Sequence, residues 1–252
     1  MTRRDRIASA FSRASSTYNR ASELQEIAAA RLAARILQTE LPDQPNVLEF
    51  GCGTGGLTRL LLPRLPGHWT ITDIAPAMVD AARKALSKSG GVYRVMNGEA
   101  PDVAPESQHL IVSNLAAQWF EDLPGSIARL SQCLSPGGRL MITTLGKNSL
   151  AEWRDAVHSL GQDWGTPAYP SSEALAQGLP DGTSAAVSSD LIPMRYADGA
   201  SFLKTLRTIG ATTPARDYRP LPAPLLRRAM DSLGAPCTIT YEVLTIDLTR
   251  LP

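Results

Sequence analysis

The chain has 252 residues, of which 43% are hydrophobic and 19% charged, the composition of an ordinary globular protein with a sizeable core. Its 25 Lys and Arg nearly balance 24 Asp and Glu, and this near-neutrality argues against the general basicity of a nucleic-acid-binding protein. No apolar run approaches the length of a membrane span and no apolar signal core opens the chain, which predicts a cytoplasmic protein without a membrane partner.

Residues 1–45 are predicted to form an N-terminal helical segment. Phe11 and Tyr18 lie in its first part, among small and polar residues. Further along, apolar residues recur at helical spacing and form one stripe: Leu24, Ile27, Ala28, Leu32 and Ile36. We expect this segment to cap the functional site, and a linker rich in proline connects it to the first strand.

A glycine-rich turn follows at 47–56, where the sequence reads VLEFGCGTGG. An apolar run that ends in glycines predicts a buried strand followed by a tight turn, and a helix is predicted next over 57–65. Glycine permits backbone conformations that a Cβ forbids and lets a ligand approach the main chain closely. Strand, glycine turn and helix in this order form the nucleotide sites of open α/β sheets.

Two ligand classes use such a turn. Gly51, Gly53 and Gly56 fit the GxGxxG pattern of dinucleotide sites, which is a weak signal when it stands alone. The pattern GxGxG, from Gly51 to Gly55, fits as well, and Glu49 adds a carboxylate at the end of the strand. A carboxylate suits a ligand with a cationic amino-acid end better than it suits a pyrophosphate, which favours the second class. A glycine turn without a ligand is the remaining alternative.

Acidic residues also follow the second and third predicted strands. The strand at 69–73 ends in Asp73, where an acid can accept both ribose hydroxyls of a nucleoside. The alternative role for Asp73 is a helix N-cap, because Pro76 opens a helix that is predicted to reach residue 88. Glu99 follows a third strand at 92–96 and can accept a hydrogen bond from an adenine amino group.

The rest of the chain continues the alternation of strands and helices, which indicates a mainly parallel sheet. A fourth strand at 109–113 ends before Asn114, at the edge where ligands bind in such sheets. The chain is expected to divide into a ligand-binding core over 46–147, a helical lid insertion over 148–183 and a C-terminal part over 184–252 that completes the sheet. Later elements are predicted as a helix at 124–134, strands at 139–145, 185–195 and 238–248, and helices at 201–209 and 223–233.

Cysteine spacing and charge distribution add two expectations. Cys52, Cys133 and Cys237 are scattered, have no metal-ligand spacing and suit a reducing compartment, so no metal is expected. Basic residues gather near the N-terminus and in the last quarter, as solvated helix faces or as a docking face for an acidic partner. They are Arg3, Arg4, Arg6, Arg13, Arg20, and then Arg195, Lys204, Arg207, Arg216, Arg219, Arg227 and Arg228.

The acid followed by GxGxG, and the run from Asp73 through Pro76 to Met78, resemble the first two motifs of class I S-adenosylmethionine-dependent methyltransferases. The resemblance implies a Rossmann-like α/β fold with a mostly parallel seven-stranded sheet flanked by helices. It also implies S-adenosylmethionine as cofactor and S-adenosylhomocysteine as product. The implied cofactor-binding residues are Glu49, Gly51, Cys52, Gly53, Gly55, Asp73, Ile74, Met78, Glu99, Ala100, Asn114 and Leu115.

Other stretches resemble a narrower family, the malonyl-[acyl-carrier protein] O-methyltransferases of biotin biosynthesis. The stretches are FSRASSTYNRASELQ, SNLAAQWFEDL, ITTLGKNSLAEWRDA, SFLKTLRTIGAT and TYEVLTIDLTR. The resemblance covers nearly the whole chain and implies methylation of the free carboxylate of a malonyl thioester. The implied partner is an acyl carrier protein that carries malonyl-phosphopantetheine. Two positions depart from the family pattern, Glu99 in place of the usual Asp and His109 where an acid is common.

A carboxylate substrate is already ionised near neutral pH, so the implied reaction requires no general base. Neutral donors suit contact with this carboxylate, because a tightly held anion is a poor nucleophile. Tyr18, Gln118 and Trp119 are the candidate catalytic residues, and Arg195 is a candidate substrate contact by position alone. Core packing is the alternative role for Trp119, and a solvent-facing loop position is the alternative for Gln118.

Two other functions share these motifs. One is a carboxyl methyltransferase that acts on a free small acid such as aconitate, and the other is a non-catalytic methyltransferase-like binding subunit. Turnover of free acids in preference to carrier-bound malonate would favour the first. Failure to bind S-adenosylmethionine would favour the second.

Overall fold

The computed structural model describes residues 2–15, 17–87, 90–163, 165, 168–211 and 220–252. A seven-stranded sheet crosses the molecule in the order β3-β2-β1-β4-β5-β7-β6. The first five strands pair in parallel, and β7 lies antiparallel between β5 and β6, which confirms the predicted mostly parallel α/β sheet. The strands are β1 Asn46–Glu49, β2 His68–Asp73, β3 Val92–Val95, β4 Gln108–Ser113, β5 Leu134–Leu145, β6 Thr183–Tyr196 and β7 Cys237–Arg250.

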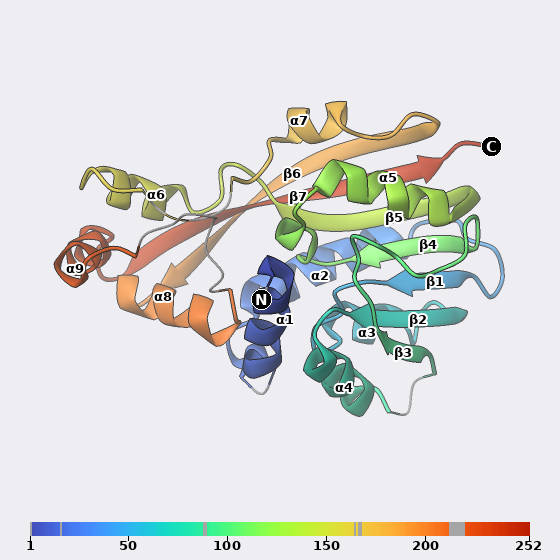
Figure 1. Cartoon of the computed structure of the whole chain (residues 1–252), viewed down its shortest axis with the longest axis horizontal. Coiled ribbons are helices and arrows are strands. Elements are labelled where there is room, and N and C mark those ends of the chain that lie inside the picture. The colour runs from blue at the N-terminus through green and yellow to red at the C-terminus, as the bar shows by residue number, and fades with distance from the viewer. Residues whose placement is uncertain (1, 16, 88–89, 164, 166–167, 212–219) are drawn as a thin grey trace.

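Helices cover both faces of the sheet because its central strands are apolar on both sides. Val47 packs with α2, α3 and α4 on one face, while the next residue, Leu48, packs with α5 on the other. Figure 1 shows α5 on one side of the sheet and α4 on the other. The helices are α1 Arg3–Ala14, η1 Tyr18–Arg20, α2 Glu23–Ile36, α3 Gly56–Leu61, α4 Pro76–Ala85, η2 Ala117–Trp119, α5 Leu123–Cys133, α6 Ala151–His158, α7 Ser172–Gln177, α8 Gly199–Thr208 and α9 Ala223–Ser232.

A third apolar cluster lies at one end of the molecule. There β6 and β7 extend past β5, and α6, α8 and α9 gather around them, as Figure 1 shows. The cluster joins Trp153 of α6, Phe202 of α8 and Ala229 of α9 to Ile239 and Tyr241 of β7. The last quarter of the chain therefore builds both an edge of the sheet and a separate chamber beyond it.

The register of β7 is fixed at its far end by a two-pronged ion pair. Arg139 of β5 donates from Nε and Nη2 to the two carboxylate oxygens of Asp247, each at 2.7 Å. Parallel donation of this kind constrains geometry as well as adding energy. The pairing of β7 with β5 and β6 sets which of its residues face the chamber, and this ion pair adds to that pairing.

Some element boundaries differ from the expected ones. Residues 134–138 belong to β5, although the helix is predicted to reach residue 134 and the strand to begin at 139, because Leu134 already pairs with Gln108 of β4. Helix α3 ends at Leu61, earlier than predicted. The segment 148–183, proposed as a lid, contains α6 and α7. Trp164, Arg216 and Arg219 lie outside the described residues. Among the helices that the structure describes, none is long and apolar enough to cross a membrane.

Candidate active site

The glycine turn after β1 is held by backbone hydrogen bonds to the neighbouring strands. The amide of Phe50 donates to the carbonyl of Val112, and the amide of Cys52 donates to that of Thr72. Gly51 has φ of 64°, and a Cβ there would lie 2.3 Å from the Cβ of Ala116. Glycine is therefore required at Gly51 for both conformation and space.

Asp73 at the end of β2 closes the same turn. Its Oδ2 accepts from the amide of Gly53 at 2.9 Å, and its Oδ1 accepts from the amide of Ala75 at 2.8 Å. The residue is 7% exposed, and burial raises the pKa of its carboxyl above the ordinary value, against the opposing effect of these hydrogen bonds. Asp73 thus ties β2, the glycine turn and the start of α4 together.

Glu49 is a second buried carboxylate beside the turn. It is 1% exposed, and its Oε2 accepts from the hydroxyl of Thr58 at 2.7 Å. Burial raises the pKa of Glu49 to about 8, with a smaller contribution from the charge of Asp73. No Lys, Arg or His of the described residues forms a salt bridge with Glu49 or Asp73. A cationic ligand would supply the compensating charge that this part of the protein lacks.

A first cavity opens above the turn. Eight of the twelve predicted cofactor residues line it: Gly51, Gly53, Asp73, Ile74, Met78, Glu99, Asn114 and Leu115. Glu49, Cys52, Gly55 and Ala100 do not line it. The lining that sequence reasoning missed is mostly apolar or comes from the N-terminus: Arg3, Arg4, Ile7, Phe11, Phe50, Met96, Asn97, Gly98, Ala116, Phe120 and Glu121.

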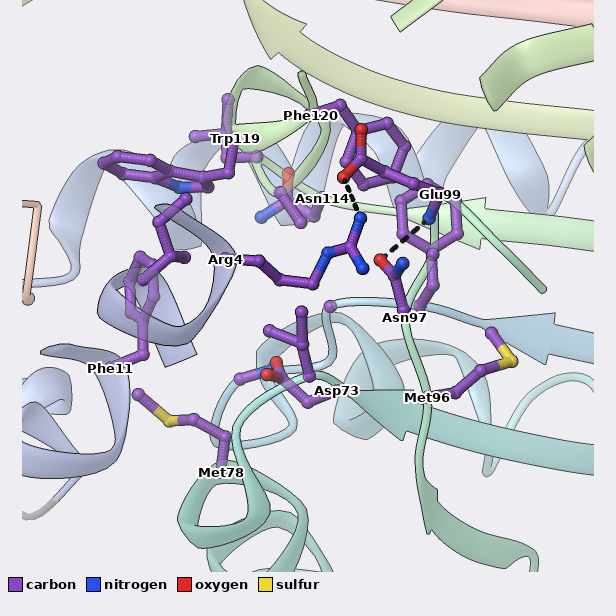
Figure 2. A pocket seen from close by; sticks show the side chains of 18 of the residues that line it. Arg4, Phe11, Asp73, Met78, Met96, Asn97, Glu99, Asn114, Trp119 and Phe120 are labelled. Atoms are coloured by element: carbon purple, nitrogen blue, oxygen red, sulfur yellow. Dashed lines mark hydrogen bonds and ion pairs between the residues drawn. The ribbon is translucent and has the colours of Figure 1, made fainter. Parts of the chain in front are cut away.

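The N-terminal helix α1 forms the outer wall of the first cavity. Arg4 extends from α1 into the cavity toward Glu99, as Figure 2 shows, and the closest approach between their charged groups is 3.6 Å. Arg3 donates from Nη1 to the carbonyl of Trp119 at 3.0 Å. With α1 in this position the cavity measures about 80 Å³. Pockets for drug-sized ligands typically measure about 300–1,000 Å³, so such a ligand requires Arg4 to move.

Glu99 also has a structural role. Its Oε1 accepts from the amides of Glu121 and Asp122 at 2.7 and 3.3 Å, and its carbonyl accepts from Nε of Arg129 at 2.6 Å. These contacts join the loop after β3 to the start of α5. These contacts occupy Oε1 of Glu99. Its other carboxylate oxygen, Oε2, faces Arg4 and the cavity.

The end of β4 is fixed by a hydrogen-bond network to β5 and α2. Thr143 donates to Oδ1 of Asn114 at 3.0 Å and accepts from the amide of Leu115 at 2.8 Å, while Nδ2 of Asn114 donates to the carbonyl of Gln25 at 2.9 Å. Leu115 has φ of 48°, a strained conformation for a residue with a side chain. The network compensates this strain and holds Leu115 where it lines the cavity.

A second cavity of about 620 Å³ lies in the chamber between β7, α6, α8 and α9. Its lining includes the predicted residues Gln118 and Arg195. Nε2 of Gln118 already donates to the carbonyl of Leu115 at 2.7 Å. Four residues line both cavities and therefore form a shared wall: Phe11, Tyr18, Leu115 and Trp119.

Aromatic rings dominate this shared wall. The rings of Phe11 and Trp119 meet edge to face with centroids 5.4 Å apart, and Phe11 lies 6.5 Å from the ring of Tyr18. Burial raises the pKa of Tyr18 well above its ordinary value, and the charge of Asp73 raises it further, so its phenol stays neutral at physiological pH. In the sequence, Phe11 is marked only by its helical spacing from Ile7. That spacing does not place Phe11 at the site, because it does not say where α1 lies.

Comparisons with known proteins agree with this architecture. A family model described as a methyltransferase domain matches residues 20–179. The chain is 38% identical to the malonyl-[acyl-carrier protein] O-methyltransferase of Magnetococcus marinus, covering 98% of this chain and 93% of that protein. It is 41% identical to the biotin biosynthesis bifunctional protein BioCD of Bordetella avium, over 94% of this chain and 50% of that longer protein. The solved YcgJ protein of Bacillus subtilis has the same fold, with a TM-score of 0.62 and 14% identity over 88% of this chain and 99% of its own.

Proposed function

Because this chain belongs to the malonyl-[acyl-carrier protein] O-methyltransferase family, we propose that it methylates the free carboxylate of malonyl-[acyl-carrier protein] with S-adenosylmethionine as methyl donor. The methyl ester masks a charge, so that the acyl group can be elongated toward the pimeloyl chain of biotin. The fold, the cavity walls and the family agree on this reaction class. The cytoplasmic location remains a prediction from sequence.

The residues around the first cavity fit S-adenosylmethionine. The cofactor carries a positive sulfonium and an ammonium group, and the glycine turn holds two buried carboxyl groups, Glu49 and Asp73, that have no salt-bridge partner among the described residues. Once Arg4 has moved, its adenosine would pack against Phe50, Phe120 and Met96 of the cavity lining. Asp73 would accept from the ribose hydroxyls through its remaining lone pairs, and Glu99 from the adenine amino group once Arg4 has moved. Glu49, buried behind the lining, would act through its charge once the cation of the cofactor has lowered its raised pKa.

The observation that carries the proposal is the wall shared by the two cavities. A methyl donor in the first cavity and a carboxylate in the second would meet at Tyr18, Leu115 and Trp119. When bound, S-adenosylmethionine supplies an electrophilic methyl group that a carboxylate oxygen takes up as the carbon–sulfur bond breaks, leaving S-adenosylhomocysteine and a methyl ester. No proton is transferred, which agrees with the absence of a base in the shared wall.

The protein's own contribution is alignment and exclusion of water. The edge-to-face pair of Phe11 and Trp119 keeps the meeting point dry, and the neutral phenol of Tyr18 would donate one hydrogen bond to the carboxylate. Holding two reactants in line supplies several kcal/mol of the barrier, about 7–11 kcal/mol in the best intramolecular cases. A neutral donor orients the anion without the strong attraction that would lower its nucleophilicity.

The second cavity is suited to the arm that delivers the malonyl group. Its volume of about 620 Å³ lies within the typical range for a ligand pocket, about 300–1,000 Å³. Its lining is largely apolar, and its polar side chains are several tyrosines together with Glu23, Gln25, Gln118, Arg195, Thr205 and Arg207. Thiol-linked substrates on a flexible arm require such a channel, because the reacting carboxylate lies at the far end of the arm.

A methyl-transfer assay tests the function directly. Labelled S-adenosylmethionine is offered with malonyl-carrier protein, malonyl coenzyme A, free malonate or aconitate, and kcat/KM is compared. We expect the carrier-bound substrate to be preferred by a wide margin. Best turnover of a free acid would instead assign the protein to the small-acid carboxyl methyltransferases, and no binding of S-adenosylmethionine in calorimetry would leave a non-catalytic subunit.

A further inference from the structure

The second cavity is bounded by two helices whose inner and outer faces differ in character. Leu203 and Leu206 of α8 and Leu226 of α9 line the cavity. The exposed faces of the same helices carry Lys204, Arg207, Arg227 and Arg228. Figure 1 shows α8 and α9 together at the end of the molecule beyond β5. Arg195, near the end of β6, is also exposed, and these five residues are called the basic rim below.

Two residues of the basic rim mark an opening of the cavity. Arg195 and Arg207 both line the second cavity and are exposed to solvent. A side chain that does both stands where the cavity meets the surface. The inner end of the same cavity is the wall at Tyr18 and Trp119, so a path runs from the basic rim to the proposed point of methyl transfer.

The charge of the basic rim is not neutralised within the described residues. None of its five side chains forms a salt bridge or side-chain hydrogen bond there. Three of the N-terminal basic residues differ, because Arg4 pairs with Glu99, Arg3 donates to Trp119, and Arg13 donates to Ser9. The cavity lining contains one acid, Glu23, across from α8 on α2.

The sequence concentrates positive charge in the stretch of chain that contains the rim residues. Seven of the 25 Lys and Arg but only three of the 24 Asp and Glu lie between residues 195 and 232, so the rest of the chain carries an excess of three acids. A basic patch on an otherwise slightly acidic protein attracts a negatively charged partner to one place.

We propose that the basic rim is the docking surface for the acidic body of the acyl carrier protein, with the arm entering beside Arg195 and Arg207. The inference rests on the proposed function for its choice of partner. Unpaired cations around the mouth of an apolar channel fit an acidic protein that inserts a thiol-linked arm. Such a contact forms rapidly and is weakened by salt, because it depends on charges that stay near solvent.

Matched charge reversals test the surface. The double variants Lys204→Glu/Arg207→Glu and Arg227→Glu/Arg228→Glu are compared with Arg59→Glu/Arg64→Glu on and after α3, where both arginines are exposed and lack an ion pair within the described chain. Each double variant changes the net charge by the same amount. A difference in carrier binding between the variants therefore depends on where the reversed charges lie. Binding of S-adenosylmethionine and the thermal transition serve as checks that each variant has folded.

Two readouts separate docking from chemistry. The first is kcat/KM for malonyl-carrier protein relative to malonyl-N-acetylcysteamine, a small thioester without the carrier. The second is the Kd for the holo carrier protein without a malonyl group, which reports docking even if methyl transfer were absent. We expect each rim variant to weaken both carrier readouts by at least about tenfold, with the control within about twofold, and the salt dependence to flatten in the rim variants only.

Several outcomes would overturn the proposal. Equal losses in the control would show that net charge matters and position does not, and unchanged carrier binding in both rim variants would remove this surface from docking. Wild-type protein that binds the holo carrier through the rim but transfers no methyl group would overturn the proposed function while leaving the docking surface in place. If the wild-type protein methylates the carrier substrate and the rim variants methylate it equally well, the proposed function stands and the docking surface is overturned.

Discussion

Arg4 of α1 and Glu99 of the loop after β3 form an ion pair across the first cavity, with a closest distance of 3.6 Å. Glu99 is the acid expected to meet the adenine amino group, and Arg4 lies in front of it (Figure 2). Binding of a cofactor and closure of α1 in this position therefore compete for the same carboxylate oxygen.

We expect Arg4→Ala to bind S-adenosylmethionine as tightly as the wild type or up to about fivefold more tightly. A half-exposed ion pair contributes roughly 0–1 kcal/mol, and its loss removes the competition for Glu99. Calorimetry and stopped-flow binding measure the affinity and the association rate, with Arg6→Ala on the exposed face of α1 as the control. Affinity that fell tenfold or more would show that Arg4 contacts the bound cofactor.

Glu49→Gln tests the buried carboxylate at the end of β1. The wild-type pKa is raised to about 8, so the folded protein holds this proton more tightly than the unfolded chain does. The free energy of unfolding of the wild type should therefore fall as pH rises from about 4.5 to 8, by on the order of 4 kcal/mol from this group. Glu49→Gln keeps an acceptor for Thr58 and should lack that part of the decrease.

Urea unfolding at pH 5, 6, 7 and 8, without cofactor, measures this difference. The two proteins share every other titrating group, so subtracting their curves isolates Glu49. Parallel curves over the whole range would mean that the carboxylate ionises in the folded protein without cost.

Asp73→Ala should weaken S-adenosylmethionine binding by roughly 1.5–3 kcal/mol, the range for a charged hydrogen-bond partner. The variant should also lose stability, because the amides of Gly53 and Ala75 lose their acceptor. Calorimetry well below the thermal transition of the variant separates the two effects. Asp80→Ala on α4, an exposed position that pairs with Arg83, is the matched control. Unchanged affinity in Asp73→Ala would remove Asp73 from the ribose role.

Substitution by alanine should have different effects at Gly51 and at Gly53 of the glycine turn. At Gly53 a new Cβ would have no protein atom nearer than Cε1 of Tyr18 at 3.9 Å, so the cost to stability should be the backbone strain alone, about 1–2 kcal/mol. That Cβ would lie on the cavity wall, and cofactor affinity should fall at least about tenfold. At Gly51 the clash with Ala116 should destabilise the fold itself. Thermal unfolding and calorimetry on both variants measure this contrast, which Gly53→Ala with full affinity would contradict.

Tyr18→Phe should lower kcat for malonyl-carrier protein by about three- to tenfold, the effect of one lost hydrogen bond, and leave the Kd of S-adenosylmethionine nearly unchanged. Because the raised pKa keeps Tyr18 neutral, the wild type and the variant should have the same pH profile below pH 9. A change confined to cofactor affinity would place the phenol on the cofactor side of the shared wall.

Local sequence patterns predicted the parts of the site that depend on neighbouring residues. The strand, glycine turn and helix around Gly53 and the acid at Asp73 follow from backbone sterics and from the edge at which parallel strands end. Contacts between distant segments gave no such signal. Arg4 and Glu99 are far apart in the chain, and only the position of α1 brings them together. The start of β5 was missed because Leu134 is a strand residue through its pairing with Gln108, whereas the local sequence continues the pattern of the helix that ends at Cys133.

The ion pair between Arg139 and Asp247 joins β5 to β7 within a register that decides what lines the chamber. Asp247 lies six residues from Tyr241, about 20 Å along an extended chain, and side chains of a strand change sides at every residue. A slip of a single position would turn Ile239, Tyr241 and Val243 away from the substrate chamber and send Leu244 and Ile246 into it. Backbone pairing of β7 with β5 and with β6 holds this alignment, and the ion pair adds one polar contact to it. The lining of the chamber at one end of the molecule is therefore decided by pairing along the whole length of this sheet edge.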